Sequence, residues 1–544
     1  MDAQAELIVD ARGAGTRSAV AVRGGKITAT ASGDEDVDAL LVRLRGKDTT
    51  VRQYDGVLAP LFIDTHNHLA LASRNKLGVP MRDVVTIEDV LDRIRARAAV
   101  TPPGSWVITA ADWHEMQLRE RRLPTAVELD AAAPNHPVLV QRGGHNAVLN
   151  TAGLAAAGIT ATSGDVPDGH VARAVDGTPT GLVQDGAFTA IQPLLPKVSQ
   201  QELVRAIEAT SREYRAVGVG TVRDPAVSVE DWQAMQAARS AGRLHVRTFS
   251  MIFSPAALID AAGSMDAYLD DLEAQGLHPD TGDDMLRLWG IKLILDGGVE
   301  AGALRAPYAD RPDFSGTLLM TPDALTDALG ACVRRGWPVG THATGDAAID
   351  VFLDAVQRNV DLGVQHRQGR LVLEHGALID AEQIARAKAL DVHITAQQAL
   401  RDGLVAPFTQ AWGPERVAAM FPWRELLDTR VPVSAGTDHP IGPLNPLAGI
   451  VWMTTRKTSL GTLGPEHACT RIEALDLYTS AGAKLLEHDL TGKIAVGSPA
   501  DFGVYPVDLR HATDEELLHR HPTATVLAGA EPRHDVAIEP PQGK

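Results

Sequence analysis

The sequence predicts an α/β protein built on a (β/α)8 TIM-type barrel. Short apolar segments alternate with segments of helical periodicity through the middle of the chain. Several apolar segments are nearly continuous runs, which is typical of parallel strands covered on both faces. Eight such strands can be counted, and eight βα units favour a closed barrel. The alternative is a doubly wound open sheet, but no G-x-G-x-x-G follows a strand and no G-x-x-x-x-G-K-[ST] is present.

The predicted strands share an apolar run that ends in small or polar residues. In chain order they are FIDTHNHL (62–69), GVGTVRDP (218–225), LHVRTFSMIF (244–253), LWGIKLILDGG (288–298), WPVGTHATG (337–345), RLVLEHGAL (370–378), DVHITAQQ (391–398) and VPVSAGTDHP (431–440).

Helical segments with recognisable ends lie between these strands. SVEDWQAMQAARSAG has Ser228 as its N-cap, Asp231 in the capping position and Gly242 near its end. TPDALTDALGACVRRG begins with Thr-Pro and ends at Gly336, as expected of a capped helix with proline at its first position. A third helix is predicted over 380–390.

The two ends of the chain predict a separate β-domain. Residues 1–58 read as short strands with turns, and Gly24-Gly25 marks a hairpin. Residues 490–544 have a similar pattern, so the ends are expected to pair into one small domain that the barrel, 59–489, interrupts. The gap at 75–215 between barrel strands one and two contains its own strands, GSWVITAADW and HPVLVQRGGH. It is therefore predicted to be an inserted α/β subdomain.

Composition excludes several classes of protein. The 544 residues carry a formal net charge of −18, with 69 acidic and 51 basic side chains, which argues against a general nucleic-acid binder. The two cysteines, Cys332 and Cys469, form no CxxC-type pair, so neither a disulfide framework nor thiolate zinc is expected. No signal peptide and no run of 18 apolar residues is visible, so a cytoplasmic enzyme without a membrane partner is expected.

Polar residues recur where the predicted strands end. The set comprises His66 and His68 on strand one, Lys292 on strand four, His342 on strand five, His375 on strand six and Asp438 on strand eight. Each has an ordinary explanation when taken alone: most histidines and lysines are surface or satisfied core residues, and an aspartate before proline is often a turn residue. Barrel chemistry, however, sits at the C-terminal face and draws on the ends of several strands. The joint pattern therefore predicts a metal site.

The residue types agree with that chemistry. Neutral imidazoles suit Zn²⁺ and similar metals, and in a strand His66 and His68 would point to one face. A lysine ammonium is a poor ligand, but a buried lysine with a lowered pKa reacts with CO₂ to form a carbamate that bridges two metals. Asp438 would orient a metal-activated water, accept its proton and pass it to a leaving group.

The motifs resemble those of the amidohydrolase superfamily, in its YtcJ-like branch (amidohydrolase family 3), which includes N-substituted formamide deformylases. The similarity covers nearly the whole chain. The quoted motifs are FIDTHNHL, PVLVQRGGHNAVLN, DGTPTGLVQDGA, GIKLILDGG, GTHATGDAAID, LEHGALI, SAGTDHPIGPLNP and GKIAVGSPADFGV. The resemblance implies a metal-dependent barrel with a composite β-sandwich from both ends, one or two divalent ions, most simply zinc, and a homodimer.

The resemblance also implies roles for single residues. His66, His68, Lys292, His342, His375 and Asp438 are the expected metal ligands, with Asp438 also the general base and Lys292 a candidate for carbamylation. His145, in RGGHN, is expected to contact substrate or assist catalysis, or else to hold its own loop. Trp113 and His114, in ADWHE, are candidate substrate contacts, together with MRDV near 81 and the stretch 300–316. Asp296 and Asp346 are expected to be structural.

The sequence is compatible with three functions. The first is hydrolysis of an amide or N-substituted formamide in a small molecule, giving a carboxylate and an amine. The second is a cyclic-substrate enzyme, either a lactam or lactone hydrolase or a deaminase. The third is a non-catalytic scaffold, which is disfavoured because all six expected ligands are present. A serine hydrolase is disfavoured as well, since no G-x-S-x-G elbow occurs.

Overall fold

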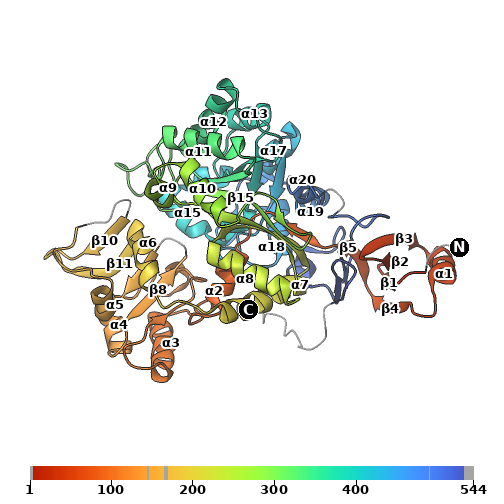
Figure 1. Cartoon of the computed structure of the whole chain (residues 1–544), viewed down its shortest axis with the longest axis horizontal. Helices are drawn as coiled ribbons and strands as arrows, with labels where there is room; N and C mark the ends of the chain where they lie inside the picture. Colours follow the sequence, from red (N-terminus) through yellow and green to blue (C-terminus); the bar gives the residue numbers. More distant parts are fainter. Residues whose placement is uncertain (1–3, 144–145, 165–168, 489–490, 532–544) are drawn as a thin grey trace. The chain divides into compact units, whose positions relative to one another are not determined.

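The chain forms two compact units in the computed structural model, which describes residues 4–143, 146–164, 169–488 and 491–531. One unit comprises residues 1–69 and 210–544, and the other comprises 70–209. Figure 1 labels the helices and strands of both. Within the described ranges, no helix is both long enough and apolar enough to cross a membrane.

The larger unit contains a nearly closed barrel of eight parallel strands, as predicted. Neighbouring strands pair in chain order with parallel registers throughout. The strands are β6 (Phe62–Asp64), β12 (Val219–Val227), β13 (Arg247–Phe253), β15 (Leu286–Ile294), β16 (Val339–Ala343), β17 (Leu371–His375), β18 (His393–Ala396) and β19 (Val433–Ala435). The first and last strands approach each other where Thr65 N–H donates to the Ala435 carbonyl at 3.3 Å.

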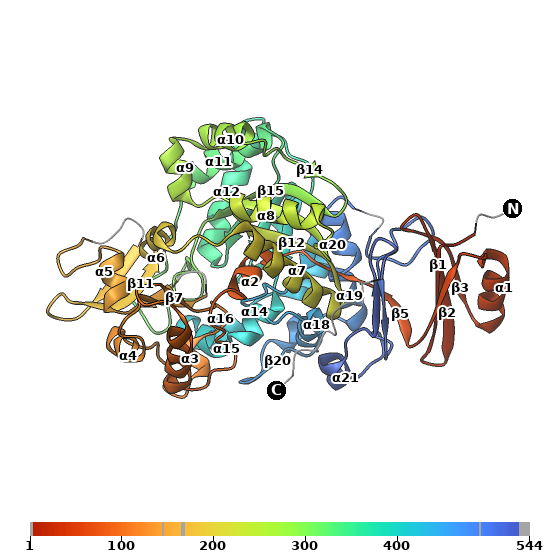
Figure 2. The ribbon, with the colours of Figure 1, turned by 60° about the horizontal axis from the view of Figure 1, so that its bottom comes forward.

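Helices surround these strands, as the views of Figures 1 and 2 both show. They are α8 (Val229–Ser240), α9 (Ala256–Ala262), α10 (Met265–Ala274), α11 (Pro322–Arg334), α12 (Asp346–Asp361), α13 (Ala381–Ala389), α14 (Gln398–Gly403), α15 (Val405–Trp412), α16 (Pro414–Ala419), α17 (Trp423–Thr429), α18 (Pro446–Thr455), α19 (Arg471–Leu477) and α20 (Ser480–Leu485). The three helices predicted between the strands are confirmed. Ser228 and Asp231 form the capping box of α8, and the Thr321 side chain caps α11.

Two small sheets at the chain ends share one hydrophobic core. The first, in the order β3-β2-β1-β4, uses β1 (Leu7–Gly13), β2 (Thr16–Arg23), β3 (Lys26–Ser32) and β4 (Thr50–Asp55). The second, in the order β23-β22-β5, joins β5 (Val57–Pro60) to β22 (Phe502–Tyr505) and β23 (Ala524–Val526). Val9, Val20 and Phe502 lie in the core between them. Gly24 and Gly25 adopt φ of +57° and +73° in the predicted hairpin.

One helix in this region was not predicted. Residues 1–58 were expected to form strands and turns, but α1 (Asp34–Leu44) covers one face of the first sheet. Its buried residues Val37, Leu40 and Leu44 follow helical spacing, and three acidic residues occupy its first turn. Helix α21 (Asp514–His519) lies between β22 and β23 in the sequence.

The smaller unit is an α/β structure around a five-stranded sheet. The sheet runs β10-β11-β9-β8-β7, formed by β7 (Val107–Ile108), β8 (Val138–Arg142), β9 (Asn146–Leu149), β10 (Gly169–Arg173) and β11 (Pro179–Asp185). Its helices include α3 (Ile87–Val100), α4 (Ala126–Ala132), α5 (Thr151–Ala156) and α6 (Gly186–Ile191), while α2 (Leu69–Asn75) and α7 (Gln200–Ala216) lie where the chain passes between the units. Two separate apolar clusters form its core.

A buried ion pair ties the barrel to the C-terminal sheet. Arg247 of β13 donates to Asp501 Oδ2 at 2.9 Å, and the side chains are 3% and 6% exposed. Asp501 Oδ1 accepts the Ala528 N–H at 2.7 Å. Removing one partner of such a pair leaves the other charge buried without compensation.

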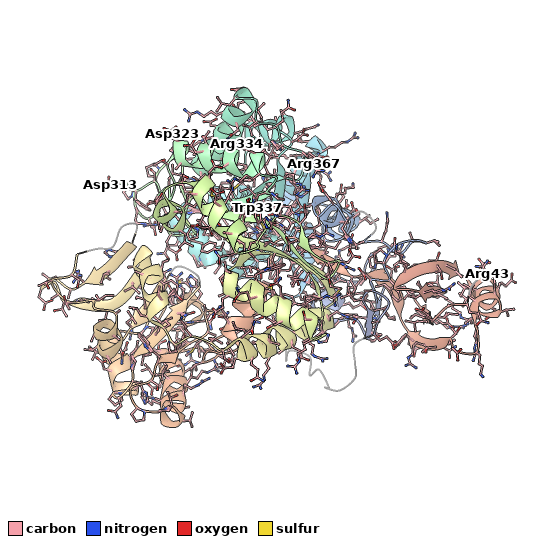
Figure 3. All side chains as sticks on the ribbon, viewed as in Figure 1. Arg43, Asp313, Asp323, Arg334, Trp337 and Arg367 are labelled. Atoms are coloured by element: carbon pink, nitrogen blue, oxygen red, sulfur yellow. The ribbon has the colours of Figure 1, made fainter. Side chains whose placement is uncertain are left out.

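We therefore expect Asp501→Ala to lower the free energy of unfolding by about 3–5 kcal/mol, measured by denaturant titration. Asp323→Ala is the control, because Asp323 of α11, labelled in Figure 3, pairs with Arg358 of α12 at the protein surface, where the Asp323 side chain is 85% exposed. Equal stabilities of the two variants would contradict the structural role of the buried pair.

Candidate metal centre

The first pair of predicted ligands lies beyond the end of β6 rather than within it. The strand stops at Asp64, so the expectation that His66 and His68 share a strand face was wrong. The two rings converge nevertheless, with centroids 5.2 Å apart. Backbone bonding explains this, because the His66 carbonyl accepts the Asp438 N–H at 2.9 Å and the His68 N–H donates to the His439 carbonyl at 2.8 Å.

His66, His68 and Asp438 bring three possible ligand atoms within 4.8 Å of one another. Asp438 Oδ1 lies 2.9 Å from His68 Nε2 and 3.4 Å from His66 Nε2. Within the described residues, His66 Nε2 and Asp438 Oδ1 have no hydrogen-bond partner. Buried lone pairs that face a common space fit the donor set of a divalent cation.

The remaining predicted ligands border the same cluster. The His375 ring is 4.6 Å from that of His66 and 4.5 Å from that of His342, centroid to centroid. His342 Nε2 lies 3.3 Å from the Gly297 carbonyl oxygen. Lys292 is 3% exposed, its charge interacts with those of Glu374 and Asp438, and within the described part of the chain its Nζ has no hydrogen-bond partner. All six predicted ligands therefore come from the same end of the barrel.

An unusual backbone conformation orients two of these side chains toward the centre. His375 and Asp438 adopt positive φ of +72° and +57°, a region that non-glycine residues seldom occupy. Successive side chains of a strand point to opposite faces, yet Glu374 and His375 both contact His66. The left-handed conformation at His375 breaks the alternation and lets both neighbours face the centre.

Two buried charged residues of the centre were not predicted. The Glu374 carboxylate accepts the His66 Nδ1–H at 2.6 Å and is held by both Nη atoms of Arg223, at 2.7 and 2.8 Å. Both side chains are fully buried. A glutamate and an arginine within apolar strand sequences could have predicted a buried ion pair, because such residues are rarely buried unless they are paired.

Burial and neighbouring charges set the protonation of the centre. Burial lowers the pKa of Lys292 to about 8 and that of His375 well below its ordinary value. Burial would raise the pKa of Asp438, but the approach of His66 and His68 holds it well below the usual range. For His66, burial lowers the pKa while the charge of Glu374 raises it, and the net direction is upward. A cation at this position would compete with a proton for the Nε2 lone pair of His66.

Asp296 supports the loop that follows β15. Its carboxylate accepts the backbone N–H groups of Ala303, Thr344 and Gly345, each at 2.9 Å. Asp346, at the start of α12, accepts the Arg305 N–H at 2.8 Å. These bonds agree with the structural roles expected of both aspartates.

Three of the candidate substrate contacts, Trp113, His114 and His145, belong to the smaller unit. Trp113 lies in its core and donates its indole N–H to the Gln141 carbonyl at 2.6 Å. His114 caps a short helix, where its Nδ1 accepts the Met116 N–H at 3.1 Å. His145 lies outside the described residues. Contact of these three with substrate stays a prediction.

Comparison with known proteins identifies the family. The amidohydrolase family model, amidohydrolase family 3, matches residues 55–531. The chain belongs to the amidohydrolase family. This confirms the resemblance drawn from the motifs, and the matched range includes all six predicted metal ligands of this amidohydrolase.

Individual relatives are distant but nearly full-length. Putative amidohydrolase YtcJ of Bacillus subtilis is 28% identical over 477 residues, covering 85% of this chain and 86% of that protein. N-substituted formamide deformylase of Arthrobacter pascens is 28% identical over 492 residues, covering 87% and 86%. A crystal structure of an uncharacterized metal-dependent hydrolase from Pyrococcus horikoshii aligns with a TM-score of 0.72 at 23% identity, covering 94% of this chain and all of that one. The structural match supports the barrel fold.

The buried amine of Lys292 should impose a pH dependence on the stability of the metal-free amidohydrolase. With the folded pKa at about 8 and an ordinary value of 10.5, the unfolded chain binds more protons between these values, so stability rises with pH there. Lys292→Met should add about 3 kcal/mol at pH 7 and progressively less above pH 8.

Denaturant titrations of chelator-treated protein between pH 7 and pH 10 would measure this difference. Lys457→Met, which removes an exposed lysine, is the matched control and should follow the wild-type curve. If the free energies of unfolding of Lys292→Met and wild type differ by a constant amount across this pH range, the pKa of Lys292 is not lowered by folding.

Proposed function

We propose that this protein is a metal-dependent hydrolase that cleaves a carbon–nitrogen bond of amide or N-substituted formamide type in a small molecule. The observation that carries the proposal is the convergence of His66, His68 and Asp438 ligand atoms within 4.8 Å at the mouth of the barrel. Membership of the amidohydrolase family supports the reaction class. The name of the Arthrobacter pascens relative supports the bond type.

The proposed metal ligands are the six residues at the strand ends. His66, His68, His342, His375 and Asp438 would hold one or two divalent ions, with zinc favoured by the imidazole-rich donor set. Lys292 would join them after its amine, largely neutral above a pKa of about 8, adds to CO₂ and loses a proton to form a carbamate. When bound, such a cation lowers the pKa of a coordinated water and polarises a carbonyl group.

Asp438 is the proposed general base and general acid. Its carboxylate is ionised at neutral pH because His66 and His68 hold its pKa low, and it is buried beside the space where substrate would react. It would accept a proton from the attacking water as the new C–O bond forms. It would then deliver that proton to the nitrogen as the C–N bond breaks, releasing a carboxylate and an amine.

Metal content tests the proposed centre directly. We expect the wild-type protein, purified without chelator, to contain one or two zinc ions per chain by elemental analysis. His66→Ala/His68→Ala should contain none, and Lys292→Ala should lose one ion if a carbamate bridges a pair. An absence of metal from wild type, under conditions where added zinc is freely available, would refute metal dependence.

Product analysis tests the reaction and the role of Asp438. Among N-substituted formamides, N-acyl amines, lactones and amino-heterocycles, we expect turnover of the first two, with equal amounts of carboxylate and free amine. Asp438→Asn should lower kcat by about 10²–10⁴-fold, the usual contribution of a proton-transferring side chain. Ammonia release from the heterocycles instead would favour a deaminase. Unchanged turnover by Asp438→Asn would remove that residue from the mechanism.

A further inference from the structure

A hydrogen-bonded carboxylate lies directly behind the proposed metal centre. Glu374 Oε2 accepts the His66 Nδ1–H at 2.6 Å and the Thr395 hydroxyl at 2.5 Å. Arg223 donates to both carboxylate oxygens, at 2.7 and 2.8 Å, and its Nε–H donates to the Thr65 carbonyl at 2.8 Å. Oε1 of Glu374 therefore accepts one hydrogen bond, and Oε2 accepts three.

This arrangement leaves Glu374 little freedom to move. A Cβ at Gly340, on the neighbouring strand β16, would come within 2.0 Å of Glu374 Oε1. The absence of a side chain at that position leaves room for the carboxylate beside Arg223. A bidentate guanidinium–carboxylate pair also fixes the plane of the carboxylate, and with it the direction of the bond to His66.

The bond to Glu374 determines which nitrogen of His66 is available. A neutral imidazole carries one N–H and one lone pair, and a carboxylate at Nδ1 places the hydrogen there. The lone pair is then on Nε2, the atom that lies 3.4 Å from Asp438 Oδ1 and has no hydrogen-bond partner among the described residues.

His375 is oriented by the same kind of contact. Its Nδ1 lies 2.7 Å from Gln397 Oε1, and the Gln397 amide nitrogen donates to the Thr395 carbonyl at 2.9 Å. The second bond fixes which end of the amide faces His375, so the imidazole donates from Nδ1 and presents Nε2 to the centre. Both histidines thus have Nδ1 engaged by a fixed acceptor.

We infer that Glu374, clamped by Arg223 and Thr395, is the positioning residue that fixes the tautomer and ring orientation of His66 for metal binding. The inference rests on the proposed metal-dependent function. Partners of this kind raise the affinity of a site because the ligand no longer samples other tautomers or orientations when the ion binds. The Glu374 side chain is fully buried and contacts His66, so it would act through His66, and its loss should weaken metal binding.

The test compares Glu374→Gln, Thr395→Val and Thr341→Val with wild type. Thr395→Val removes one donor to Glu374 and keeps the charge pair. Thr341→Val is the matched control, because its buried hydroxyl on β16 has no hydrogen-bond partner within the described ranges.

Zinc affinity is measured by competition with a chromogenic chelator. The visible spectrum of the Co²⁺-loaded protein reports ligand geometry, and thermal unfolding of metal-free protein reports folding.

The inference predicts zinc binding about 10–100-fold weaker in Glu374→Gln and at least about threefold weaker in Thr395→Val, with altered Co²⁺ spectra and Thr341→Val like wild type. If Glu374→Gln does not fold, the test depends on Thr395→Val. A zinc affinity of Thr395→Val equal to that of Thr341→Val then overturns the inference. Folded Glu374→Gln with wild-type affinity also overturns it. Wild type that binds no more zinc than His66→Ala/His68→Ala overturns the proposed function together with the inference, which separates the two failures.

Discussion

The contact between the first and last barrel strands is the constraint on which the proposed centre depends. The Asp64 carboxylate at the end of β6 accepts the Thr437 N–H at 2.9 Å and the Thr437 hydroxyl at 2.6 Å. These bonds join segments more than 370 residues apart and place His66 and His68 against Asp438. Gly436 permits the approach, because a Cβ there would lie 2.7 Å from the His66 backbone nitrogen. Without this contact, the three ligand atoms that define the candidate site would not meet.

Charge pairing explains why so many ionisable groups can be buried at one end of the barrel. Arg223 compensates Glu374, and Asp438 faces two imidazoles rather than an apolar wall. Lys292 makes no hydrogen bond among the described residues, and burial lowers its pKa although the charges of Glu374 and Asp438 act in the opposite direction. The centre therefore combines one buried ion pair, Arg223 and Glu374, with ligand side chains whose protonation can change when a metal ion binds or when Lys292 is carbamylated.

The barrel and the candidate ligands were predictable from the sequence because both follow local patterns. Each strand is an apolar run, and His342, His375 and Asp438 stand where such runs end. The network around Glu374 was less accessible, because its partners Arg223 and His66 are separated from it by 151 and 308 residues. The positive φ of His375 reverses the alternation that a strand pattern assumes. Helix α1 could have been predicted, because Val37, Leu40 and Leu44 recur at helical spacing after three acidic residues.

The pairing of β5 with β22 has a consequence for the order in which the protein acquires its structure during synthesis. Pro60 aligns with Phe502, so the ribosome must add 442 further residues before the second small sheet can form. At 5–20 residues per second, that interval is roughly 20–90 s. Strand β5 therefore spends most of translation without its partner strand β22, with Leu58 and the core side chains around it available to chaperones.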